Sequence, residues 1–118
     1  FDRFPNAKLI LGHMGETLPY QLWRFNSRWA ISNKGSKKLM LLPSEYFKKN
    51  FWCTTAGVCS DEPLRCAIDA LGTDRVMFSV DYPFEKSEHA GLWIDNANLS
   101  VTEKSMVCHE NAKSLLKL

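Results

Sequence analysis

The sequence lacks several features that assign small proteins to a class. Its four cysteines include no C-x-x-C pair, so the spacing of a zinc ribbon is absent. No apolar run approaches the roughly 20 residues that a membrane-spanning helix needs. The glycines at positions 12 and 15 fit neither the dinucleotide-binding nor the phosphate-binding loop pattern. A formal net charge of +2 is too small to indicate a nucleic acid or a membrane surface as the partner.

The composition is that of an ordinary globular protein, with 45% apolar and 24% charged residues. We expect a single domain over residues 1–118. The chain starts at Phe1 with neither an initiator methionine nor the charged-then-apolar start of a signal peptide, so we expect a domain truncated at its N-terminal side. Reduced cysteines and a cytoplasmic location are expected. The one basic cluster, residues 34–38, predicts a solvated loop rather than an anion site.

Two stretches of similar form organise the chain. Residues 8–11 are a brief apolar run, which predicts a strand buried on both faces, and His13 and Glu16 follow its end. Residues 76–80 predict a second strand of this kind, and Asp81 follows its end. Ligands bind at the carboxyl ends of parallel strands in α/β folds. The sequence therefore predicts one site built from neighbouring strand ends.

The rest of the chain alternates between strand and helix patterns. A further strand is predicted at residues 51–54, and helices are predicted at residues 18–31, 44–49, 62–71, 87–96, 101 onward and 111–118. Alternation at this spacing is typical of an α/β fold with parallel strands and helical crossovers. Three parallel strands leave both sheet edges open. We therefore expect the chain to be part of a larger α/β barrel or sheet.

Local signals predict how the helices begin and dock. Asp61 is expected to cap the helix that follows it. Ser100 and Glu103 have the spacing of a capping box. The last helix is expected to dock through Leu115 and Leu116.

His13 has two interpretations. A histidine after a strand is often only a hydrogen-bonded turn residue. Its neighbours favour a function, because Gly12 and Gly15 free the backbone to turn and leave room for a ligand. Glu16 is close enough in the chain to orient the ring, although it also fits a stabilising charge near a helix N-terminus. Neutral imidazole binds metals or moves protons near neutral pH.

Asp81 and Arg24 also have structural alternatives. Asp81 fits a turn cap, but at a strand end it also fits a metal ligand or a proton donor. Neighbouring aromatic residues such as Phe84 lower the local polarity, which favours the protonated carboxyl, whereas a bound cation favours the charged form. Arg24 fits a solvated helix charge, or a fork that binds a substrate carboxylate. His89 and His109 are predicted to be surface residues.

Four segments carry a resemblance to a known family. They are residues 4–16 with the run Ile-Leu-Gly-His-Met-Gly-Glu, residues 18–20 together with 23–24, residues 78–85 with the run Phe-Ser-Val-Asp-Tyr-Pro-Phe-Glu, and residues 111–112 together with the terminal Leu-Lys-Leu. Together they resemble the amidohydrolase-related metal-dependent decarboxylases, and most of all the 2,3-dihydroxybenzoate and γ-resorcylate decarboxylases. The resemblance covers nearly the whole chain.

The resemblance implies a fold and a set of site residues. The fold is a TIM-barrel-like metal-dependent hydrolase fold, of which this chain looks like the C-terminal part with about three strand–helix units. Asp81 is implied as the metal ligand and catalytic acid, His13 as the active-site histidine, and Glu16 as its catalytic partner. Arg24 and Phe84 are implied on the substrate side. The implied metal is a divalent ion, Zn²⁺ or Mn²⁺.

The implied reaction is the non-oxidative loss of CO2 from an ortho-hydroxybenzoate, carried out by a homo-oligomeric enzyme on a small aromatic acid. In such a reaction a positioned acid protonates the ring carbon while a metal neutralises charge and fixes geometry. The family's Glu-x-His or His-x-His motif and its middle-strand histidine are absent here, which leaves Asp81 as the expected protein ligand. A catalytic metal has about three protein ligands. We therefore expect the chain alone to bind metal weakly.

Two other functions remain open at the level of the sequence. The same fold supports a metal-dependent hydrolase of an amide, an ester or a lactone. A catalytically incomplete fragment would instead associate with other chains through open strand edges and apolar faces. The aromatic-rich residues 20–29 are the expected contact surface of a homo-oligomer, although a buried core face explains the same pattern.

Overall fold

The computed structural model describes residues 1–32 and 38–118 of the chain. The predicted basic loop at residues 34–38 therefore lies outside the described residues, apart from Lys38. None of the helices in the described ranges combines the length and the apolarity needed to cross a bilayer.

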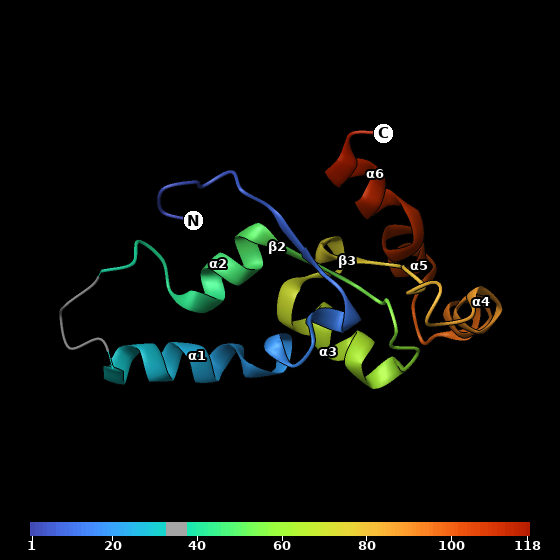
Figure 1. The fold of residues 1–118 in the computed structure, drawn as a ribbon, viewed down its shortest axis with the longest axis horizontal. Helices are drawn as coiled ribbons and strands as arrows, with labels where there is room; N and C mark the ends of the chain where they lie inside the picture. The colour runs from blue at the N-terminus through green and yellow to red at the C-terminus, as the bar shows by residue number, and fades with distance from the viewer. Residues whose placement is uncertain (33–37) are drawn as a thin grey trace.

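Strands and helices alternate along the chain, as the sequence pattern predicts (Figure 1). The strands are β1 (Leu9–Leu11), β2 (Phe51–Thr54) and β3 (Val76–Met77). The helices are α1 (Leu18–Ser32), α2 (Pro43–Asn50), α3 (Asp61–Leu71), α4 (Ser87–Asn96), α5 (Val101–Ser105) and α6 (Asn111–Leu116). Three shorter turns complete the order: the 3-10 turns η1 (His13–Gly15) and η2 (Thr73–Arg75), and the π-helical turn η3 (Met106–Glu110), which joins α5 to α6.

In the described part of the chain the sheet has three strands in the order β1-β2-β3, and all neighbours are parallel. Leu11 pairs with Cys53, and Cys53 pairs in turn with Val76. α1 and α2 connect β1 to β2, and α3 connects β2 to β3, so each connection is a helical crossover. This confirms the predicted α/β class. It also places the carboxyl ends of all three strands at one edge of the sheet.

The predicted burial of the first strand on both faces is wrong. Leu9 and Ile10 are 47% and 49% exposed. β1 is the edge strand of the described sheet and has β2 as its neighbour. A short apolar strand of this kind needs cover on both faces and at its edge, which the described residues do not supply.

The third strand is shorter than the predicted residues 76–80, because its hydrogen-bond partners change after Met77. The N–H of Phe78 donates to the carbonyl of Val107 rather than to β2. Further along, the hydroxyl of Thr55 holds the backbone of Ser79, at 2.7 Å from its carbonyl oxygen and 2.9 Å from its nitrogen. Residues 78–80 therefore continue beside β2 without a regular ladder.

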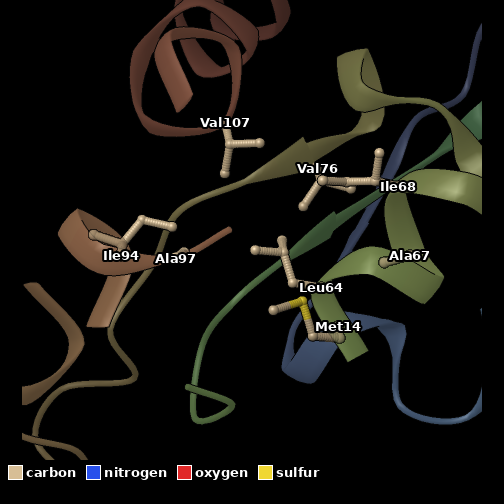
Figure 2. Packing of buried hydrophobic residues seen from close by; sticks show 8 residues of the cluster. All are labelled: Met14, Leu64, Ala67, Ile68, Val76, Ile94, Ala97 and Val107. Carbon is tan, nitrogen blue, oxygen red and sulfur yellow. The ribbon is translucent and has the colours of Figure 1, made fainter. Parts of the chain in front are cut away.

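Two clusters of buried apolar side chains pack around this sheet. The first joins η1, α3, β3, α4 and η3 (Figure 2), and consists of Met14, Leu64, Ala67, Ile68, Val76, Ile94, Ala97 and Val107. The second lies among α1, α2, α3 and β2, and consists of Leu22, Phe47, Cys53 and Leu71. On α1, Leu22 is buried, and Leu18 and Phe25 pack against the second cluster.

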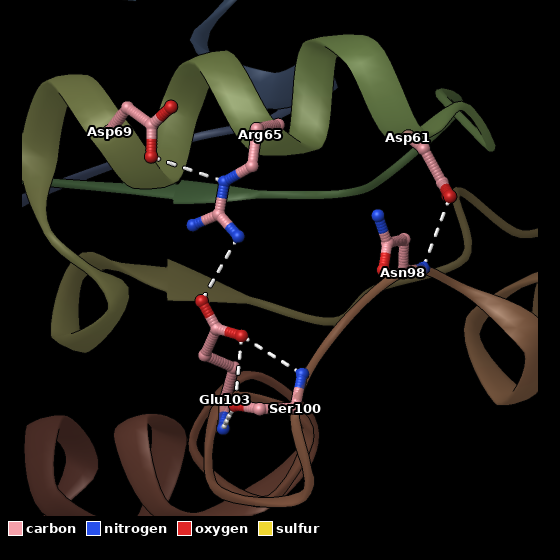
Figure 3. A network of polar contacts seen from close by, with 6 residues as sticks. All are labelled: Asp61, Arg65, Asp69, Asn98, Ser100 and Glu103. Carbon is pink, nitrogen blue, oxygen red and sulfur yellow. Dashed lines mark hydrogen bonds and ion pairs between the residues drawn. The ribbon is translucent and has the colours of Figure 1, made fainter.

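The N-terminus of α3 differs from the prediction. Ser60, not Asp61, is the cap residue of this helix. The carboxylate of Asp61 instead accepts hydrogen bonds from the indole of Trp93 (3.0 Å) and from the backbone N–H of Asn98 (3.1 Å). It therefore ties α3 to α4 and to the segment that follows α4, as the Asp61–Asn98 bond in Figure 3 shows.

The predicted capping box at Ser100 and Glu103 is confirmed. The Glu103 carboxylate accepts from the backbone N–H of Ser100 at 2.9 Å, and the Ser100 hydroxyl accepts from the N–H of Glu103 at 3.2 Å. Arg65 then donates to the other Glu103 oxygen at 3.0 Å and to Asp69 at 3.1 Å (Figure 3). These bonds connect α3 to the start of α5.

The C-terminal helix docks differently from the prediction. Leu115 is half-buried, but Leu116 is 57% exposed and does not dock. The buried anchor is Asn111, whose amide donates to the carbonyls of Thr73 and Val76. The asparagine amide satisfies one backbone acceptor in η2 and one in β3, which an apolar side chain cannot do.

All four cysteines are free thiols, and their burial varies widely. Cys53 is fully buried in β2, and this burial raises the pKa of its thiol to about 11. Cys108 is exposed on the π-helical turn η3.

Glu103 generates a prediction for acid stability. The N–H and hydroxyl of Ser100, followed by Arg65, lower the pKa of Glu103 from 4.5 to about 2. A depressed folded-state pKa stabilises the fold above the unfolded pKa, and this stability is lost as the pH falls through the folded value. Between pH 5 and pH 2, the melting temperature of Glu103→Gln should therefore fall by a few degrees less than that of the parent chain.

Circular dichroism melts across this pH range measure the difference. Glu88→Gln, which changes an exposed glutamate in the first turn of α4, serves as the control and should follow the parent. Equal acid sensitivity of Glu103→Gln and the parent chain would contradict the prediction.

Candidate functional site

A tight turn directly after β1 presents His13. The N–H of Gly15 donates to the carbonyl of Gly12 at 2.8 Å, and the N–H of Glu16 donates to the carbonyl of His13 at 2.8 Å. Gly15 has a φ of +72°, and a Cβ there would lie 2.7 Å from the Sγ of Cys53. Gly15 is therefore required by both conformation and space.

The expectation that Gly12 frees the backbone is wrong. Its φ of −69° and ψ of −178° are ordinary extended values. A Cβ at this position would meet the Cβ of Ala56 at 3.9 Å, which is a normal contact. The turn depends on the second glycine and on the residues between the two.

Met14 anchors this turn in the core. Its side chain is 2% exposed and lies beside Leu64 of α3 in the first cluster (Figure 2). The side chain of the preceding residue, His13, is 45% exposed. The buried methionine thus fixes the backbone that carries the half-exposed imidazole.

The structure brings His13, Glu16 and Asp81 together. The Nδ1 atom of His13 lies 3.1 Å from the Oε1 atom of Glu16, and its Nε2 atom lies 3.4 Å from the Oδ2 atom of Asp81. The side chain of Asp81 is 29% exposed and that of Glu16 is 74% exposed. One imidazole therefore bridges two carboxyl groups, one on each ring nitrogen.

The two contacts of His13 determine how many protons the three side chains must hold. A carboxylate only accepts hydrogen bonds, and a neutral imidazole donates from one nitrogen only. Both contacts of His13 are hydrogen bonds only when the ring carries two protons or one of the carboxyl groups carries a proton. The three side chains then hold one proton more than a neutral ring between two carboxylates, and this proton can pass between the ring and Asp81.

Asp81 also forms a turn, as its structural alternative suggests. Its backbone carbonyl accepts from the N–H groups of Phe84 (2.9 Å) and Glu85 (3.1 Å). The main chain of Asp81 makes the turn, and its carboxyl group remains available to His13.

The loop after β2 completes the site, and the sequence analysis missed it. Thr55 is 1% exposed and fixes the backbone of Ser79, two residues before Asp81. Gly57 has a φ of +69°, and a Cβ there would lie 2.8 Å from the Cδ2 atom of His13. The signal that could have found these residues is their position, because they follow the end of the middle strand.

Backbone strain is concentrated at the same place. Four residues other than glycine have positive φ values in or beside the site: His13 (50°), Met14 (54°), Glu16 (55°) and Asp81 (81°). Such conformations cost free energy and are commonly found at active sites, where the surrounding structure holds them.

The two residues implied on the substrate side, Phe84 and Arg24, lie in different parts of the structure. Phe84 is 85% exposed on the turn that Asp81 forms. Arg24 is exposed on α1, about 9 Å along the helix axis from Leu18. Within the described residues the side chain of Arg24 forms no ion pair or hydrogen bond, so the structure does not join it to His13. His89 and His109 are exposed, as predicted.

The donor set does not fit a complete metal site. In residues 1–32 and 38–118 no group of three or more His, Cys, Asp and Glu side chains could hold a metal ion. Both nitrogens of His13 already face carboxyl groups. Asp81 can supply one carboxylate ligand, whereas a catalytic site has about three protein ligands.

The chain matches known proteins over its whole length. The Amidohydrolase family description matches residues 1–118. A gamma-resorcylate decarboxylase from Polaromonas sp. is 40% identical, and the match covers 100% of this chain and 36% of that protein. The chain thus spans about a third of the length of this relative.

Solved structures of decarboxylases also match the whole chain. The 5-carboxyvanillate decarboxylase LigW from Sphingomonas paucimobilis superposes with a TM-score of 0.96 at 41% identity, covering 100% of this chain and 36% of that one. A dihydroxybenzoic acid decarboxylase from Polaromonas sp., with bound manganese and the inhibitor 2-nitroresorcinol, superposes with a TM-score of 0.86 at 40% identity, covering 100% and 36%.

The site geometry predicts that Thr55 supports the position of Asp81. Thr55→Val keeps the shape of the side chain but removes both hydrogen bonds to Ser79. Leaving these backbone groups unpaired should lower the free energy of unfolding by about 1–3 kcal/mol. Urea unfolding measures this change, with the exposed Thr102→Val on α5 as the control. A loss no larger than that of the control would show that the Thr55 bonds are dispensable.

Proposed function

Because the chain belongs to the Amidohydrolase family, we propose that the protein carrying it is a metal-dependent decarboxylase of ortho-hydroxybenzoate-type aromatic acids. The resemblance to decarboxylases of this family is confirmed, and so is the fold class. The relatives named above decarboxylate hydroxylated aromatic acids. The activity, the substrate and the partners of the whole protein are proposals, since the chain spans about a third of these relatives.

The observation that carries this proposal is the pairing of His13 with Asp81. Their side chains come from the segments that follow β1 and β3, two strands that are separated by β2, yet Nε2 and Oδ2 are 3.4 Å apart. An imidazole and a carboxyl group in this arrangement can share and transfer a proton near neutral pH.

The proposed chemistry needs one proton at a defined place. The ring carbon that bears the substrate carboxylate takes a proton from the Asp81 carboxyl group. The bond from this carbon to the carboxylate then breaks, CO2 leaves, and the electron pair of the bond restores the aromatic ring. His13 returns a proton to Asp81 and takes its replacement from solvent, which reaches its half-exposed ring, while Glu16 holds the ring in place at 3.1 Å.

We propose that Arg24 and Phe84 bind the substrate. The guanidinium fork of Arg24 matches a carboxylate. The ring of Phe84, which is largely exposed beside Asp81, offers an apolar surface to an aromatic acid.

We propose a divalent metal, Zn²⁺ or Mn²⁺, for the whole protein, with Asp81 as the ligand from this chain. Bound manganese in a solved relative supports a divalent metal in the family. Because the residues of this chain do not fit a complete site, no step above passes through the metal, and its other ligands must come from outside the chain.

We further propose a homo-oligomer that uses the outer face of α1. Leu22 faces the core, but Tyr20 and Trp23 are 83% and 76% exposed. Exposed aromatic residues of this kind are typical of interfaces.

The four free cysteines support a reducing compartment such as the cytoplasm.

Activity tests the proposal directly. In the whole protein that carries this chain, CO2 release from 2,3- and 2,6-dihydroxybenzoate should exceed turnover of a panel of amides, esters and lactones. Asp81→Asn and His13→Asn should each lower kcat by roughly 10²–10⁴-fold, which is the usual contribution of a positioned acid or base.

His109→Asn is the matched control, because His109 also faces a carboxylate, Glu110, at 2.8 Å, but on the surface of η3. Its kcat should stay within twofold of the parent. Hydrolysis of a lactone or amide without CO2 release would replace the proposed reaction by the hydrolase alternative.

Metal binding gives a separate prediction for the chain alone. Calorimetric titration with Mn²⁺ or Zn²⁺ should detect no 1:1 binding at micromolar or tighter affinity, because one carboxylate cannot replace about three ligands. Tight binding that is lost in Asp81→Ala would show that the chain forms the site by itself.

A further inference from the structure

Gly57 lies against the gap between the two paired side chains. A Cβ built on this glycine would have three nearest neighbours, and all belong to the pair: Cδ2 of His13 at 2.8 Å, Oδ2 of Asp81 at 3.1 Å and Nε2 of His13 at 3.2 Å. A distance below 3.0 Å is not tolerated between such atoms, so either the ring or the carboxyl group would have to move.

The backbone of Gly57 is held by the segment after β3 that leads to Asp81. Its N–H donates to the carbonyl of Val80 at 3.3 Å, one residue before Asp81. Two residues earlier, Thr55 accepts from the N–H of Val58 through its carbonyl at 2.9 Å and bonds the backbone of Ser79 through its hydroxyl. The loop therefore cannot retreat from the pair without breaking these bonds.

His13 and Asp81 have little freedom to yield either. Glu16 holds the Nδ1 atom of the ring at 3.1 Å, and Met14 fixes the adjoining backbone in the core. Asp81 has a positive φ of 81° and accepts two turn hydrogen bonds through its carbonyl. A methyl group at position 57 would therefore change the spacing of the pair rather than be absorbed elsewhere.

We propose that Gly57 is a positioning residue, which sets the separation between His13 and Asp81 by leaving the space that any side chain would occupy. The inference rests on the proposed function for its meaning in catalysis. The geometry it describes can be tested without any activity.

The test compares three glycine-to-alanine variants. Gly57→Ala places a methyl group against the pair. Gly72→Ala imposes a comparable backbone strain, because Gly72 has a φ of +103°, but its new Cβ would meet only Asp74 beyond the far end of α3. Gly91→Ala enters open space on α4, with nothing within 4 Å.

Nuclear magnetic resonance of the chain with labelled histidine rings gives the readout. At one fixed pH, the ring ¹⁵N and ¹³C signals of His13 should shift in Gly57→Ala and stay in place in the two other variants. His89 and His109 serve as internal references and should not shift in any of them. An unmoved His13 signal in Gly57→Ala, or equal shifts in Gly72→Ala, would overturn the inference.

Thermal unfolding gives a second test, which still applies if Gly57→Ala folds too poorly for magnetic resonance. Gly57→Ala should lower the melting temperature more than Gly72→Ala does in the parent chain. In a His13→Ala background, where the 2.8 Å contact no longer exists, this extra loss should become smaller. An extra loss of the same size in both backgrounds would show that the methyl group does not act on His13.

The outcomes separate this inference from the proposed function. In the whole protein, Gly57→Ala should lower kcat at least tenfold with little change in KM, because the pair is displaced but the substrate side is not. If the protein instead hydrolyses a lactone, the proposed function fails, and the resonance shift of His13 still decides the role of Gly57.

Discussion

The structure depends on the parallel arrangement of three strands, because this arrangement alone brings distant parts of the chain to one edge. His13 follows β1 and Asp81 follows the segment beyond β3, so 68 residues separate them in sequence. The register that pairs Leu11 with Cys53 and Cys53 with Val76 aligns the strand ends. A shift of register would separate the imidazole from the carboxyl group, and no local interaction could bring them together again.

The middle strand has a double role in this arrangement. β2 pairs with both outer strands and so aligns them, and the loop that follows β2 lies against the side chains of His13 and Asp81. Thr55 fixes the loop to the segment that carries Asp81, while the buried Met14 fixes the turn that carries His13. The exposed site thus rests on two buried side chains, one on each side of the gap.

The sequence allows much of this to be predicted, but not all of it. The order of the elements follows from periodicity, and the meeting of His13 with Asp81 follows from the rule for strand ends. The burial of single side chains is harder to predict. The exposure of Ile10, which is half-exposed, depends on what lies beside an edge strand rather than on the strand itself. The proposed role of Gly57 could not be predicted from the sequence. It depends on the distances from position 57 to the side chains of His13 and Asp81, which follow two other strands.

The positive φ angles at the site couple backbone strain to the side-chain contacts. At each of these positions a glycine would relieve the backbone at no steric cost. The chain nevertheless holds a methionine at position 14, which contributes to the core, and His13, Glu16 and Asp81, which face one another instead. Glycine at position 13, 16 or 81 would relax the local backbone but would also remove a contact between the ring and a carboxyl group, so strain and contact belong to the same residues.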